Sequence, residues 1–83
     1  MSLSRTTRTA LGMTQQSFAK WLAEQTGGRS MPQSQISRYD NGVNQMNRAQ
    51  VEACAPVAAK WLAKETRKMP LDKAAEMILE ALR

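Results

Sequence analysis

The chain of 83 residues contains no histidine and only one cysteine, Cys54. Histidine is the commonest general base and the commonest metal ligand, so its absence argues against both kinds of chemistry. One cysteine cannot form an internal disulfide bond or a thiolate zinc cluster, and no histidine is present to activate it. We therefore expect Cys54 to be a small buried apolar residue, the protein to be cytoplasmic, and no metal or cofactor to be bound.

Several longer patterns are also missing. No apolar stretch has the length of a membrane span, and the segment MSLSRTTRTALG lacks the apolar run of a signal peptide, so we expect no membrane association. Gly27 and Gly28 have neither the spacing nor the following lysine of a phosphate-binding loop. Asp72, Glu76 and Glu80 recur every four residues, which is more typical of a solvated helix face than of a metal site. We expect no enzyme activity, no catalytic residue and no small-molecule ligand.

Acidic residues are scarce in the first half of the chain. Twelve Lys and Arg residues against seven Asp and Glu give a net charge of +5. Residues 1–38 contain five of the basic residues and a single acidic one, whereas the remaining residues are nearly balanced. Such a basic half favours a polyanionic partner such as nucleic acid, and the plainer alternative is a chance excess on a solvated surface.

The β-branched residues are too few, and alternate too little, to indicate any strand. Helix caps and breakers instead divide the chain. Thr14 and Asn47 are good N-caps, Gln50 comes close to completing a capping box with Asn47, and Gly12 and Gly42 are typical of helix ends. We expect helices that start near residue 2 or 4 and end at 11, and that cover 15–25, 32–41, a stretch from 47, and a stretch from 70.

The number of helices depends on Pro56, which either lies at the end of the helix from residue 47 or begins another helix. The segment AKWLA occurs at residues 19–23 and again at 59–63, and we expect each copy to be an amphipathic helix face with a buried tryptophan. The predicted fold is therefore a single all-α domain, a compact bundle of five or six short helices.

One of the expected helices is unusually polar. The segment QSQISRYDNG, residues 33–42, contains Ile36 as its only plainly aliphatic residue. Together with the preceding LGMTQQSFAKWL, this segment resembles the Cro/C1-type, lambda-repressor-like helix-turn-helix domains of phage and plasmid repressors. The resemblance covers residues 3–66. It implies that the 32–41 helix lies in the DNA major groove and that Ile36 anchors this helix to the rest of the domain.

The resemblance also implies a role for individual side chains. Base contacts are implied for Gln33, Ser34 and Arg38. Contacts to the DNA backbone are expected for Thr14, Gln15, Arg29, Gln35, Ser37 and Arg48. The plainer interpretation of these residues is a solvated helix face, with an ordinary N-cap at Thr14 and an exposed arginine at position 48.

A structural ion pair is implied as well. In several members of the family, an arginine of the first helix pairs with the acidic residue before the closing Asn-Gly, and Arg8 and Asp40 occupy those positions. The chain departs from the family in two places. The connection between the two motif helices is several residues longer than usual, and Ser17 stands where many members have Glu.

The last helix carries more apolar surface than the terminal helix of so short a chain can easily bury. We expect residues 1–68 to form the helix-turn-helix domain and residues 69–83 to add a dimerisation element, although this helix could instead close the core of the monomer. The stripe expected at the dimer interface comprises Leu71, Ala75, Ile78, Leu79 and Leu82.

These observations predict a sequence-specific transcriptional regulator, a repressor that binds double-stranded DNA at a palindromic operator as a homodimer and is thereby associated with the nucleoid. The alternative is a protein-interaction module, such as an antitoxin subunit that neutralises a partner protein. An apolar surface left uncovered in the homodimer would favour the alternative.

Overall fold

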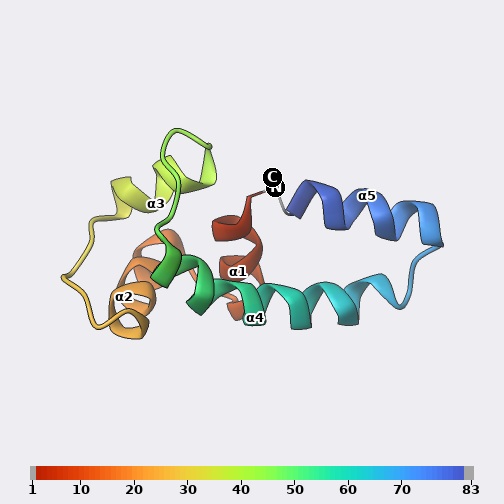
Figure 1. The fold of residues 1–83 in the computed structure, drawn as a ribbon, viewed down its shortest axis with the longest axis horizontal. Helices are drawn as coiled ribbons and strands as arrows, with labels where there is room; N and C mark the ends of the chain where they lie inside the picture. Colours follow the sequence, from red (N-terminus) through yellow and green to blue (C-terminus); the bar gives the residue numbers. More distant parts are fainter. Residues whose placement is uncertain (1, 82–83) are drawn as a thin grey trace.

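The computed structural model describes residues 2–81, which form five α-helices and no strand (Figure 1). The all-helical bundle expected from the sequence is confirmed. Over the same range, no helix has both the length and the apolar character needed to cross a membrane. The helices are α1 (Leu3–Leu11), α2 (Gln15–Gln25), α3 (Gln33–Asp40), α4 (Arg48–Thr66) and α5 (Leu71–Ala81).

The predicted caps are present at the helix ends. The side chains of Ser2 and Thr14 each accept a hydrogen bond from the backbone N–H three residues further along. Asn47 and Gln50 form the complete capping box, with two reciprocal hydrogen bonds of 2.9 Å. Gly12 ends α1 in the left-handed conformation, at φ 65°, where a side chain would be strained.

Pro56 lies inside α4, so residues 2–81 form five helices rather than six. Proline cannot donate the hydrogen bond that residue 56 would otherwise contribute to the helix. The helix nevertheless continues, and the buried side chains of Cys54 and Ala58 hold the turns on either side of the proline against the rest of the protein. Pro32 also differs from expectation, because it is the N-cap of α3 in an extended conformation and the helix itself begins at Gln33.

The hydrophobic core lies where α2, α3 and α4 meet. Phe18 and Leu22 of α2, Ile36 of α3 and Cys54 of α4 are each 0% exposed. Removal of these side chains from water is the main favourable contribution to folding in so small a domain. The burial of Ile36 is the feature that fixes α3 to the bundle.

The sequence predicted that both tryptophans would be buried, and this prediction is wrong. Trp21 and Trp61 are both partly exposed. Trp21 lies at the border of the core, where its ring stacks on Phe18 with 5.5 Å between the ring centroids and 16° between the planes. An indole is large and carries one polar N–H, so the edge of a small core accommodates it more easily than the centre.

We expect Cys54 to be unreactive in the folded protein. Burial raises the pKa of the Cys54 thiol, and a hydrogen bond with Thr7 acts in the opposite direction. The thiolate is the reactive species, so both the raised pKa and the burial slow modification. A thiol reagent at pH 8 should label the native protein far more slowly than the urea-unfolded protein. Equal labelling rates in the two states would contradict this placement of Cys54.

Helix α5 packs antiparallel along the second half of α4 and extends the protein away from α3 (Figure 1). The protein is accordingly elongated, with extents of 41 × 22 × 21 Å. Ala74 and Ala81 of α5 are buried, whereas Leu71 is 86% exposed and Leu79 is 65% exposed. The helix therefore buries one narrow stripe and leaves its larger apolar side chains in water.

Candidate nucleic-acid interface

Helices α2 and α3 pack against each other and are joined by residues 26–32. This seven-residue connection is longer than the usual three or four residues of a helix-turn-helix, as the sequence indicated. Ile36 of α3 is buried, whereas Gln33, Ser34 and Arg38 are all exposed. The three residues expected to read bases are therefore accessible on a short, anchored helix.

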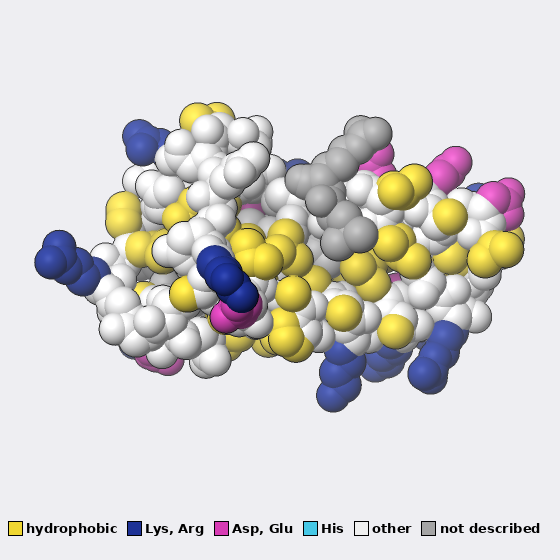
Figure 2. Space-filling view, in the orientation of Figure 1, with side chains coloured by type: hydrophobic (Ala, Val, Ile, Leu, Met, Phe, Trp, Pro, Cys, Tyr) yellow, Lys and Arg dark blue, Asp and Glu magenta, His cyan; other side chains and the backbone are white. Residues whose placement is uncertain are grey.

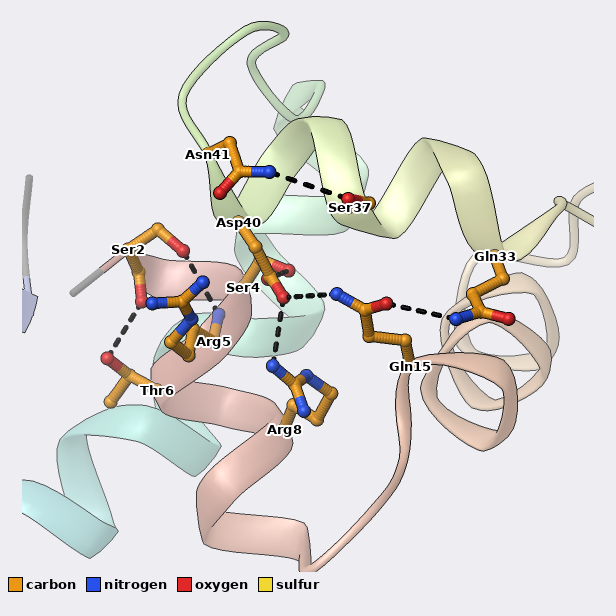
Figure 3. Close-up of polar contacts among 10 residues, drawn as sticks. All are labelled: Ser2, Ser4, Arg5, Thr6, Arg8, Gln15, Gln33, Ser37, Asp40 and Asn41. Atoms are coloured by element: carbon orange, nitrogen blue, oxygen red, sulfur yellow. Dashed lines mark hydrogen bonds and ion pairs between the residues drawn. The ribbon is translucent and has the colours of Figure 1, made fainter.

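Asp40, the last residue of α3, is the centre of a buried polar network (Figure 3). Its side chain is 0% exposed. The ion pair expected with Arg8 is present, at 2.9 Å between Arg8 Nη2 and Asp40 Oδ2. Asp40 also accepts hydrogen bonds from Ser4 Oγ at 2.7 Å and from Gln15 Nε2 at 3.1 Å. One carboxylate thus connects α3 to both α1 and α2.

The network continues through Gln15 to Gln33, an exposed residue at the start of α3. A carboxylate offers only acceptors, so Gln15 has to turn its Nε2 toward Asp40, and its Oε1 then faces Gln33. Gln33 accordingly donates from Nε2 to Gln15 Oε1, at 3.1 Å. The Oε1 atom of Gln33 points away from Gln15 (Figure 3). Asp40 therefore sets which end of the exposed Gln33 amide is turned outward.

The residues expected at the DNA backbone differ in what their side chains already do. The hydroxyl of Thr14 caps α2, so the plainer interpretation of this residue applies, and a backbone contact is compatible with it. Arg29 is exposed within the 26–32 connection. Arg48 is exposed but paired with Glu52, at 2.9 Å, so a phosphate would have to compete with a carboxylate for it. Gln35 and Ser37 of α3 are only partly exposed, and Ser37 Oγ also accepts a hydrogen bond from the amide of Asn41.

Sequence reasoning missed two members of the network. Ser4 appeared only as a possible start of the first helix, and Gln15 only as a contact to the DNA backbone. Both side chains donate hydrogen bonds to Asp40, which lies 36 residues from Ser4 and 25 from Gln15. No local pattern signals such distant partners. The only available hint was the family pairing of Arg8 with Asp40.

The residues expected to form a dimer occupy the uncovered side of α5. Leu71, Ala75, Ile78 and Leu79 are all exposed, with Ile78 at 37% the least exposed of the large ones. Leu82, the fifth, lies outside the described residues. Leu3 and Val51 contribute to the same apolar region beside α5.

Comparisons of this chain with protein-family models, with curated proteins and with solved structures gave no match. Within the part of the chain that the structure describes, no group of three or more His, Cys, Asp or Glu residues could hold a metal ion. The functional argument therefore rests on the geometry of α2, α3 and α5.

Proposed function

We propose that this protein is a sequence-specific DNA-binding transcriptional regulator, a repressor that binds a palindromic operator as a homodimer with α3 in the major groove. The observation that carries the proposal is the pre-ordered Gln33 amide. An exposed glutamine ordinarily samples many rotamers, whereas this one is held through Gln15 by a buried carboxylate. Ordering a side chain before it binds lowers the entropic cost of recognition.

The orientation of the amide supports adenine as the base read by Gln33. Glutamine pairs with adenine by accepting from N6 and donating to N7 in the major groove. The outward Oε1 of Gln33 is free for the first bond, and its second N–H is free for the other, while the first N–H remains on Gln15. Arg38, five residues further along α3, is exposed, and its planar guanidinium can donate two hydrogen bonds to N7 and O6 of guanine.

Phosphate contacts would come from the two flanks of α3. The N-terminus of α2 follows Thr14 and offers backbone N–H groups and the positive end of the helix dipole. Arg29 is exposed in the 26–32 connection, four residues before α3 begins. Contacts of this kind position the protein without reading sequence.

The direct test is selection of bound sites from a pool of random duplex DNA, followed by affinity measurements on the selected site and on a scrambled control. Two-fold symmetric sites that contain adenine and guanine at fixed spacing are expected. Binding that does not distinguish the selected site from the control at any salt concentration would refute the proposal.

We expect Arg29→Ala to weaken binding to the selected DNA and to the scrambled DNA by the same factor, because a phosphate contact carries no sequence information. The slope of log affinity against log salt should become shallower by about one contact, roughly 0.9 units. Lys73→Ala removes the same charge from an exposed position on α5 and serves as the matched control. A change in the base preference of Arg29→Ala would instead make Arg29 a base-reading residue.

The alternative function, a protein-interaction module such as an antitoxin subunit, draws on a different observation. The exposed Leu71 and Leu79 give α5 an apolar surface that any protein partner could cover. A folded, monomeric protein that selects no DNA site would favour this alternative.

A further inference from the structure

Helix α4 and the facing side of α5 line an apolar groove of about 720 Å³. The α4 wall consists largely of small side chains, because Ala55, Ala58, Ala59 and Ala63 all lie on it. Ile78 and Ala81 form the α5 wall. Alanine side chains leave the helix backbone close to the surface, so another helix can approach α4 closely at this groove.

The large apolar side chains that would fill such a groove are on the neighbouring helix of the same surface. Leu71 and Leu79 of α5 project into water, with 86% and 65% of their surface exposed. Leu71, Ile78 and Leu79 are spaced i, i+7, i+8, so the helical period places both leucines on the stripe of α5 that contains the groove residue Ile78. Figure 2 shows apolar atoms over this part of α4 and α5. One face of the protein therefore offers both an alanine-lined groove on α4 and a leucine-bearing ridge on α5.

The two edges of this face carry opposite charges. Lys60 and Lys64 are exposed and lie one turn apart on the side of α4 turned away from α5. Asp72 and Glu76 are exposed and lie one turn apart on the side of α5 turned away from α4. Figure 2 shows basic side chains below α4 and acidic side chains above α5, with apolar atoms between them.

This arrangement discriminates between two ways of pairing the face with a second copy. A two-fold axis in the face and perpendicular to the helices would place α5 on α5, so the acidic edges would meet each other and the basic edges would meet each other. A two-fold axis parallel to the helices would place α5 of each copy on α4 of the other. The leucines then meet the alanine-lined groove, and each acidic edge meets a basic edge.

The axial levels also match in the second arrangement. Helices α4 and α5 are antiparallel and joined by a short turn, residues 67–70, so residues equally far from the turn lie at similar levels. A rotation about an axis parallel to the helices preserves these levels. Lys64 therefore comes close to the level of Asp72 of the other copy, and Lys60 comes close to the level of Glu76.

We propose that the α4–α5 face binds the same face of a second copy, related by a two-fold axis parallel to these helices. This inference rests on the homodimer of the proposed function and names its interface. It also explains how two recognition helices can serve one palindromic site. An axis parallel to α4 and α5 keeps both α3 helices at the same end of the dimer, whereas the perpendicular axis would put them at opposite ends.

Sedimentation of charge-reversed variants tests the arrangement. K60E/K64E and D72K/E76K should each dimerise at least about tenfold more weakly than the wild type at low salt, since each variant places like charges along both symmetric edges. The quadruple variant K60E/K64E/D72K/E76K should dimerise as tightly as the wild type. An equimolar mixture of the two double variants should form a heterodimer of similar affinity. Circular dichroism checks that every variant is folded.

Each contrary outcome has a distinct meaning. Double variants that dimerise as tightly as the wild type would show that α5 does not face α4 of the partner, and a monomeric wild type would refute the interface altogether. Either result leaves DNA binding to be judged by site selection. A dimer that behaves as expected but selects no DNA site would refute the proposed function and leave the interface standing.

Discussion

Replacing Asp40 with asparagine is expected to lower the free energy of unfolding by about 3–5 kcal/mol, the usual cost of removing one partner from a buried ion pair. The carboxylate is 0% exposed and accepts hydrogen bonds from Ser4, Arg8 and Gln15. An amide at this position offers one acceptor oxygen in place of two. It would also leave the Arg8 guanidinium, whose side chain is 22% exposed, without a counter-charge.

Urea denaturation of the wild type, of Asp40→Asn and of Glu52→Gln measures this difference. Glu52→Gln is the same chemical change in an exposed pair, because Glu52 and Arg48 are 65% and 93% exposed. That pair links residues i and i+4 on the surface of α4, where such pairs contribute only about 0.3–0.5 kcal/mol. Equal effects of the two substitutions would mean that the Asp40 network does not stabilise the fold.

The second large effect is expected at Arg38. Arg38→Ala should weaken binding to the selected operator by about 1–3 kcal/mol, because a bidentate contact to guanine is lost. Preference should relax at one position of each half-site and remain unchanged at the others. Arg38 is exposed and makes no contribution to the core, so the thermal stability of the protein should hardly change.

Arg38→Lys separates base reading from simple charge. Lysine retains the positive charge and hence most of any phosphate contact, but it lacks the planar fork that matches N7 and O6 of guanine. We expect this variant to retain affinity for scrambled DNA and to lose discrimination at the same position as Arg38→Ala. Unchanged affinity and preference in Arg38→Ala would show that α3 is not seated in the groove as proposed.

The helices and their ends were predictable from the sequence because they depend on neighbours along the chain. Capping at Thr14 and at Asn47 uses backbone groups only three residues away, and the left-handed end of α1 requires only Gly12. The spacing of Phe18 and Leu22 likewise identifies the buried side of α2 without reference to other helices.

Features that depend on distant partners could not be read in this way. From the sequence, Pro56 could either lie at the end of one helix or begin another. In the structure a single helix continues through Pro56, and buried side chains lie two residues away on either side of it. The role of Gln15 depends on Asp40 and Gln33, which are 25 and 18 residues away. Only their meeting in space shows that a buried carboxylate orients the exposed amide.

The C-terminal helix α5 shows the difference between what local periodicity predicts and what packing between helices decides. Its apolar stripe is a property of the sequence alone, because the 3.6-residue period places those side chains on one side of any helix that forms there. Which members of the stripe are covered depends on how α5 meets α4, and the structure buries Ala74 and Ala81 while leaving Leu71 and Leu79 exposed. Local periodicity determines which residues share a face, whereas packing between helices decides whether that face is core or surface.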